Sequence, residues 1–319
     1  MNTDHPKPKV VVICGPTGIG KTTMAVRVAE AFTGEIVGAD SMQVYRYMDI
    51  GTAKPTINET ARIPHHMIDV ADPNDFFDAA GYVRMARPCV RKLIQNNVLP
   101  VVVGGTGLYI KALLHGLSEA AMTDPAVKNR LKNEAETCGS HFLHERLTHC
   151  DPIAARRIHP NDSFRIIRAL EVYEMTGRPM SSVQAAHQFG DNPFDALKIG
   201  LFMDRTALYA RIDQRVEAMI AAGLIDEVQG LLDSGCNPKA KAMQSIGYRH
   251  FTAYLAGHIN KNEAIRTLKR DTRRYAKRQL TWFKADREMV WMAPDDWDAI
   301  YGRVCSFLGC INDVAANHS

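Results

Sequence analysis

The sequence lacks the cysteine patterns that build disulfide frameworks or zinc sites. Its seven cysteines are scattered over 319 residues, are odd in number, and never form a C-x-x-C pair. This distribution argues against a disulfide-stabilised scaffold and a structural zinc site, and it fits a reducing cytosol.

Long hydrophobic runs, repeats and low-complexity tracts are also missing. The first apolar run covers only residues 10–14, far short of the ~18 residues that indicate a membrane span. The polar N-terminus does not resemble a signal peptide, so we predict a cytoplasmic protein without membrane segments. No segment points to an obligate protein partner. The net charge of +4 neither requires nor excludes nucleic acid.

What the sequence does contain is an alternation of short apolar runs and helical patterns. Such alternation is typical of an α/β fold with a doubly wound parallel sheet. The first run is continuous and rich in β-branched residues, as expected for a strand buried on both faces. The predicted strands cover residues 10–14, 35–39, 99–103 and 197–203, with a late strand at 289–292.

The composition of the chain changes between the third and fourth predicted strands. Residues 122–192 are polar, helical in pattern and punctuated by prolines, which mark helix starts and breaks. We therefore predict a first part of the core at 1–121 and a helical insertion at 122–195. The chain then returns to the sheet and continues as a basic, helical C-terminal region at 196–319.

A phosphate-binding loop follows the first predicted strand. Gly15-Pro16-Thr17-Gly18-Ile19-Gly20-Lys21-Thr22 matches G-x-x-x-x-G-K-[ST] between a strand and a helix. Glycines let successive backbone N–H groups surround an anion at a helix N-terminus. Lys21 adds a positive charge, and the Thr22 hydroxyl can ligate Mg²⁺. The motif predicts phosphate binding in a P-loop NTPase-like fold.

The loop alone does not show that the ligand is a nucleotide. The strand at 99–103 ends in Gly-Gly-Thr, where an NTPase would carry a Mg²⁺-binding Asp. Asp40 instead ends the second predicted strand, at the sheet edge where ligands bind. It could act as a base on an acceptor or cap a following helix, and the two roles are compatible.

Four segments together resemble the bacterial tRNA dimethylallyltransferase family. They are the loop at 15–22, Asp40-Ser-Met-Gln-Val-Tyr with Asp49-Ile-Gly-Thr-Ala-Lys, Gly104-Gly-Thr-Gly-Leu-Tyr, and Lys277-Arg-Gln-Leu-Thr-Trp-Phe. The matches run from about residue 10 to residue 290. Departures are small, chiefly Ile19 in the loop and Lys284 where arginine is frequent.

The resemblance implies transfer of a dimethylallyl group to the adenosine just 3′ of the anticodon in tRNA. Dimethylallyl diphosphate would bind the residues from Gly15 to Thr22, with Mg²⁺ shared by Thr22. Asp40 would take a proton from the adenine N6 amine, and Thr106 would orient the amine or the diphosphate. Arg211 and Arg215 could assist, although an exposed helix face explains them equally well.

The resemblance also implies a binding surface for the tRNA anticodon stem-loop. The basic segment 269–278 supports it independently, since spacings of four place two cationic stripes along a helix. The residues predicted from the resemblance are Asp40, Ser41, Met42, Gln43, Lys128, Phe164, Arg165, Ile166, Ile167, Arg168, Ser245, Ile246, Gly247, Tyr248 and Arg249, and the cationic helix adds Arg274, Lys277 and Arg278.

Two other functions share parts of this pattern. An isopentenyltransferase acting on free adenine nucleotides would use the same loop and strand-end Asp40, but it would not need a basic helix or a helical insertion. A P-loop small-molecule kinase would use Asp40 on a hydroxyl and a cationic lid for phosphoryl transfer. The arginines of the insertion are the best argument for the kinase.

Overall fold

The computed structural model describes residues 6–117, 124–187 and 192–310. Its centre is a six-stranded parallel sheet of order β3-β2-β4-β1-β5-β6. The strands are β1 (Lys9–Cys14), β2 (Gly34–Gly38), β3 (His65–His66), β4 (Leu99–Gly104), β5 (Asp195–Leu201) and β6 (Val290–Met292). The doubly wound α/β fold expected from the sequence is therefore confirmed.

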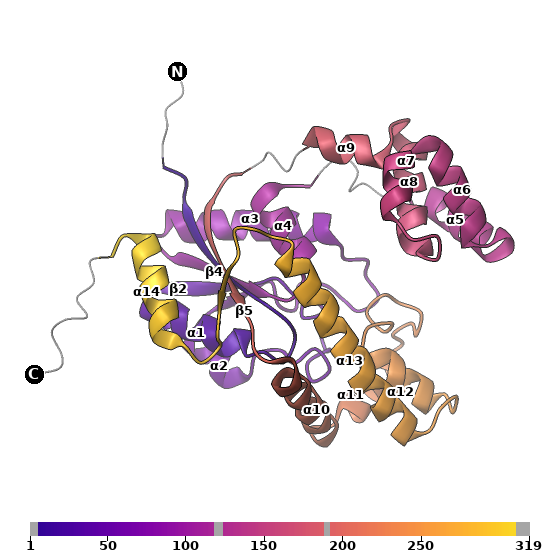
Figure 1. Cartoon of the computed structure of the whole chain (residues 1–319). Coiled ribbons are helices and arrows are strands. Elements are labelled where there is room, and N and C mark those ends of the chain that lie inside the picture. Colours follow the sequence, from indigo (N-terminus) through magenta and orange to yellow (C-terminus); the bar gives the residue numbers. More distant parts are fainter. Residues whose placement is uncertain (1–5, 118–123, 188–191, 311–319) are drawn as a thin grey trace, which may run out of the picture. The chain divides into compact units, whose positions relative to one another are not determined.

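The three central strands are apolar because both faces of the sheet are covered. Ile13 pairs with Val103 on one side and with Ile199 on the other, and residues 10–14 are fully buried. Alternate strand residues point into separate apolar clusters. One cluster includes residues of α3 (Ala79–Gln95) and α4 (Gly107–His115). The other includes residues of α1 (Lys21–Ala31) and α14 (Trp297–Leu308), so helices cover both faces (Figure 1).

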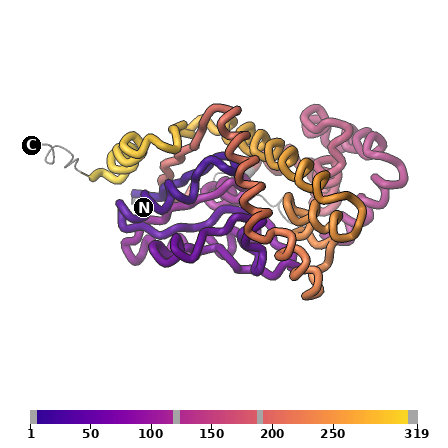
Figure 2. Tube along the Cα trace, turned by 90° about the horizontal axis from the view of Figure 1, so that it is seen from below, coloured from indigo at the N-terminus to yellow at the C-terminus, as the bar shows by residue number. Residues whose placement is uncertain are grey.

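The chain divides into two compact units, of which the first comprises Met1–Leu114 and Pro193–Ser319. Its helices are α1 (Lys21–Ala31), α2 (Ile57–Arg62), α3 (Ala79–Gln95), α4 (Gly107–His115), α10 (Arg205–Ala221), α11 (Leu224–Asp233), α12 (Tyr248–Leu255), α13 (Lys261–Lys284) and α14 (Trp297–Leu308). The long helix α13 runs beside α10 and α12 (Figure 2).

The second unit, His115–Asn192, is helical, as the polar texture of this segment indicates. It contains α5 (Pro125–Cys138), α6 (Ser140–Cys150), α7 (Pro152–Arg157), α8 (Ser163–Thr176) and α9 (Met180–His187). Leu131, Leu143 and Leu147 lie at its own apolar centre. The start predicted for the insertion, residue 122, lies outside the described residues.

The sequence-based strands differ from the structure mainly at their ends. β5 begins at Asp195 and ends at Leu201, two residues earlier at each end than predicted. β3 was not predicted, because two histidines carry no strand pattern and pair only with Ile36 and Val37 of β2. Across the described ranges, no helix is long and apolar enough to cross a membrane.

Candidate active site

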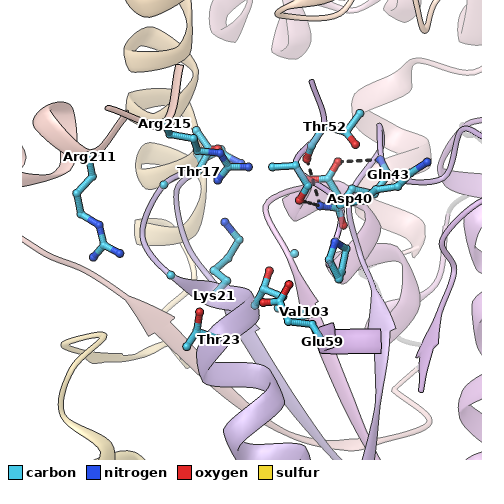
Figure 3. A pocket seen from close by; sticks show the side chains of 18 of the residues that line it. Thr17, Lys21, Thr23, Asp40, Gln43, Thr52, Glu59, Val103, Arg211 and Arg215 are labelled. Atoms are coloured by element: carbon cyan, nitrogen blue, oxygen red, sulfur yellow. Dashed lines mark hydrogen bonds between the residues drawn. The ribbon is translucent and has the colours of Figure 1, made fainter. Parts of the chain in front are cut away.

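A cavity of about 480 Å³ opens at the carboxyl ends of the central strands, within the first unit (Figure 3). The chain leaves β1 into the phosphate loop, β2 into Asp40, and β4 into Gly104-Gly105-Thr106. Parallel strands bring these three segments to one edge of the sheet, which is where α/β folds bind ligands. Helices α10 and α13 supply the remaining walls through Arg211, Arg215, Tyr275 and Gln279, among others.

The phosphate loop has the backbone shape that the sequence motif predicts. Gly18 and Gly20 have φ angles of 81° and 102°, in a region that side chains disfavour. Gly20 is the N-cap of α1, so the helix begins at Lys21, and its first residues Lys21, Thr22 and Thr23 line the cavity. Loop amides and the helix N-terminus together form an anion site.

Three cationic side chains surround this anion site. Lys21, Arg211 and Arg215 all line the cavity, so the two arginines of α10 belong to the site (Figure 3). Burial and the nearby Arg215 lower the pKa of Lys21 to about 8, against the opposing pull of Asp40. Burial also lowers the pKa of Arg215, and Asp40 again opposes the shift. Such crowding of positive charge favours a ligand with several negative charges.

Asp40 lines the cavity and organises the turn that follows it. Its Oδ1 accepts hydrogen bonds from the backbone N–H groups of Met42, at 2.8 Å, and Gln43, at 3.4 Å. These bonds satisfy the capping role considered from the sequence, although the capped segment is a turn and not a helix. The bonds fix the carboxylate in position, as a general base requires.

Thr106 lies next to Asp40, at the end of β4. Its Oγ1 accepts from the Ser41 N–H at 3.0 Å and donates to the Ser41 hydroxyl at 3.3 Å. Tyr275 of α13 lines the cavity, with its hydroxyl close to the same threonine. Burial and Asp40 raise the pKa of the Tyr275 hydroxyl, which therefore stays protonated. Tyr275 was not predicted as a site residue, because only the cations of its segment form a recognisable pattern in the sequence.

Gln43 lines the cavity with its side chain turned toward the loop at 49–54. Its amide nitrogen donates to the carbonyls of Thr52 and Ala53, at 3.2 and 3.0 Å. A base edge could therefore meet only the carbonyl oxygen of Gln43 and not its amide hydrogens. Met42 is half-buried against the core, so its side chain contributes to packing.

Glu227 of α11 holds the loop that Gln43 contacts. Its carboxylate accepts from the backbone N–H groups of Asp49, Ile50 and Gly51, at 2.8, 2.7 and 3.0 Å. The Tyr248 hydroxyl donates to it at 2.6 Å. No pattern near residue 227 predicts this role, since the partners lie far away in the sequence.

Part of the stretch at 245–249, which was predicted to contact RNA, therefore supports the fold instead. Gly247 and Tyr248 are buried, and the Tyr248 side chain is committed to Glu227. Ser245 and Ile246 are half-buried, and Arg249 is exposed but paired with Asp271 at 2.7 Å. A direct contact between the Tyr248 ring and RNA is inconsistent with this burial.

The two cationic stripes predicted on α13 are not equivalent. Lys269 forms an ion pair with Glu217, and Arg273 pairs with Asp213 at 2.7 Å, so these two cations hold α13 against α10. Arg274, Lys277 and Arg278 are exposed. The stripes therefore do not form a uniform cationic surface, because helical spacing does not reveal which cations pair with acidic residues of a neighbouring helix.

In the second unit, the segment Phe164–Arg168 also contains both buried and exposed side chains. Ile166 and Ile167 are buried in the apolar centre of the unit, so their side chains stabilise α8 and cannot contact RNA. Phe164 is 73% exposed and Arg165 is also exposed. Arg168 pairs with the buried Glu171 at 2.5 Å. Lys128 is half-buried on α5.

Fold and cavity define a class of protein: a P-loop-like α/β enzyme with a cationic anion site and a strand-end carboxylate. The sequence matches the family model described as IPP transferase over residues 43–286. A second family model, described as isopentenyl transferase, matches residues 8–73. The chain belongs to the tRNA dimethylallyltransferase family, and the resemblance inferred from its motifs is confirmed.

Named relatives agree over nearly the whole chain. The tRNA dimethylallyltransferase of Desulfosudis oleivorans is 62% identical over 90% of this chain and 91% of its own. That of Geobacter sulfurreducens is 49% identical over 95% and 98%. The chain thus spans almost the full length of these proteins.

Solved structures show the same architecture. The tRNA isopentenylpyrophosphate transferase from Bacillus halodurans has a TM-score of 0.70 and 40% identity, covering 95% of this chain and 96% of that one. A eukaryotic dimethylallyltransferase, solved acting on tRNA, has a TM-score of 0.80 and 27% identity, over 95% and 79%.

Proposed function

We propose that this enzyme transfers the dimethylallyl group of dimethylallyl diphosphate to the N6 amine of the adenosine 3′ of the anticodon in tRNA. The observation that carries the proposal is one cavity in which the anion site of Lys21 and the carboxylate of Asp40 face each other. The family's relatives are named for this reaction. The expected place of action is the cytoplasm, where the tRNA substrate is found.

The diphosphate binds at the phosphate loop, against Lys21, Arg211 and Arg215. As the amine nitrogen bonds to the allylic carbon, the carbon–oxygen bond to the diphosphate breaks and pyrophosphate leaves. Charge then accumulates on the leaving oxygens, where loop amides and the three cations stabilise it.

Asp40 acts as the base in this proposal. The adenine N6 amine is a poor nucleophile because its lone pair is delocalised into the ring. It must lose a proton as the new bond forms, and base assistance of this kind contributes about 10²–10⁴-fold. The proton passes to the Asp40 carboxylate, while Thr106 and Ser41 hold the neighbouring backbone in place.

Mg²⁺ fits the oxygen donors around the loop. Thr22 lines the cavity and carries a hydroxyl, and Mg²⁺ is commonly held by few protein ligands, substrate phosphates and several waters. No cluster of three or more His, Cys, Asp or Glu residues suited to a metal occurs in the described ranges. The diphosphate would therefore complete the ligand set, and the metal would supply charge neutralisation.

The test is transfer of label from radiolabelled dimethylallyl diphosphate, with unmodified tRNA and free AMP offered in parallel, with and without Mg²⁺. Mg²⁺-dependent label in tRNA alone is expected. Label in AMP would place the enzyme among free-nucleotide isopentenyltransferases. If neither acceptor is labelled, the proposal fails, and ATP-dependent phosphorylation would be measured next.

A further inference from the structure

Gln279 is a buried polar side chain that the proposed chemistry does not use. It lies on α13 and is only 5% exposed. Its Oε1 accepts a hydrogen bond from the Thr17 N–H at 2.8 Å, and its Nε2 donates to the Gly105 carbonyl at 2.8 Å. One carboxamide therefore joins the phosphate loop to the loop that carries Thr106.

The arrangement requires both halves of the amide. A carboxylate could accept from Thr17 but could not donate to Gly105, and an apolar side chain could do neither. The contact is also tight, because a Cβ atom on Gly105 would lie 2.1 Å from the Gln279 amide nitrogen. Any replacement leaves a buried N–H or C=O without its partner, which is costly.

The bond to Thr17 has a consequence for the anion site. Because the Thr17 amide is taken by Gln279, the amides that remain to bind the diphosphate are those after Thr17. Gln279 thus sets which part of the phosphate loop faces the ligand and fixes the orientation of that loop. The same helix, α13, also lines the cavity through Tyr275.

The same helix carries the exposed cations Arg274, Lys277 and Arg278. Gln279 directly follows Arg278 but points to the buried side of the helix. A helix is a rigid element, so a ligand that fixes the position of its outer face also fixes Gln279. If RNA binding favours this position, it raises the affinity for the diphosphate. Linkage then requires the diphosphate to raise the affinity for RNA by the same factor.

We propose that Gln279 is a positioning residue that holds the phosphate loop in its diphosphate-binding geometry and couples it to RNA docking on the outer face of α13. The RNA part rests on the proposed function. The loop part does not, since it concerns only the binding of a diphosphate.

Gln279→Met tests this by calorimetry with Mg²⁺-pyrophosphate, in the absence and presence of a tRNA anticodon stem-loop. The variant keeps the length of the side chain and loses both hydrogen bonds. Pyrophosphate affinity should fall about fivefold or more. The gain in pyrophosphate affinity caused by RNA should disappear, while RNA affinity measured alone should stay within about twofold.

Gln229→Met on α11 is the matched control, because it makes the same change at an exposed glutamine. If Gln279→Met does not give a wild-type circular dichroism spectrum, Gln279→Glu replaces it. This variant keeps the acceptor for Thr17 and loses the donor to Gly105, so the coupling should persist, and its loss would contradict a link through Thr17.

Unchanged pyrophosphate affinity and unchanged coupling in Gln279→Met would overturn the inference. Independent binding of RNA and pyrophosphate to the wild-type protein would overturn it as well. Neither measurement requires prenyl transfer. A wild-type enzyme without transfer activity would contradict the proposed function while leaving the loop part of the inference standing.

Discussion

At the scale of single residues, the position of Asp40 combines two duties that a substitution can separate. Its Oδ1 caps the following turn through Met42 and Gln43. Asparagine keeps an oxygen for these bonds but cannot take a proton. Asp40→Asn should therefore lower the single-turnover transfer rate about 10²–10⁴-fold and leave tRNA affinity unchanged. A rate within a few-fold of the wild type would remove Asp40 as the base.

Lys21 makes diphosphate binding depend on pH. Its pKa in the empty site is lowered to about 8, chiefly by burial and by Arg215. The charged form binds the anion and predominates below that pKa. As pH rises through about 8, kcat/KM for dimethylallyl diphosphate should fall, because this ratio reports ionisation of the free enzyme. Lys21→Met should lower kcat/KM and remove this limb, whereas an unchanged limb would assign it to another group.

Residues with chemical motifs were predictable, and residues that position them were not. The loop at 15–22, Asp40 and Thr106 stand in recognisable local patterns. Loop residues and Asp40 line one cavity, and Thr106 lies beside them through its bonds to Ser41. Gln279 and Glu227 act on partners that lie more than 170 positions away along the chain. A local pattern cannot show such contacts, because only the fold brings the partners together.

At the scale of elements, the loop 49–54 owes its shape to α11. The Glu227 carboxylate accepts three backbone N–H groups, and bonds to a charged acceptor contribute about 1.5–3 kcal/mol each. Glu227→Gln replaces one acceptor oxygen by a donor that opposes these N–H groups. Hydrogen exchange of the amides at 49–51 should become faster, and KM for tRNA should rise about tenfold through the loss of the Gln43 contacts.

Asp226→Asn is the control for this change, because Asp226 is exposed on the same helix turn. It should leave both quantities as in the wild type. If Glu227→Gln exchanges the three amides at the wild-type rate, the loop is held by other contacts and the assignment to Glu227 is wrong.

Helix α13 shows why helical spacing alone overestimates an RNA-binding face. Lys277 and Arg278 are exposed, whereas Arg273 is paired with Asp213. Lys277→Ala or Arg278→Ala should each weaken tRNA binding and reduce the slope of log K against log salt by about 1. Arg273→Ala should leave the slope unchanged, because that cation already has an anionic partner. Equal slopes for all three variants would mean that α13 does not face phosphates.

At the scale of the whole molecule, the sheet was the most predictable feature and the boundaries the least. Continuous apolar runs occur where both faces of a strand are covered, so β1, β4 and β5 were recognisable. The helical unit was recognisable from its polar composition. The sequence alone did not show whether Ile166 and Ile167 are buried or lie on the surface, and the structure buries both. Strand order and the pairing of α10 with α13 follow from packing that no single segment encodes.

The central claim is that this cavity prenylates the N6 amine of one adenosine. The most direct measurement is nucleoside mapping by mass spectrometry of a tRNA transcript after reaction with dimethylallyl diphosphate and Mg²⁺. A second transcript carries guanosine at the position 3′ of the anticodon, which removes the N6 amine. One dimethylallyl group is expected on that adenosine and none on the guanosine transcript. Modification of the guanosine transcript, or of any other nucleoside, would contradict it.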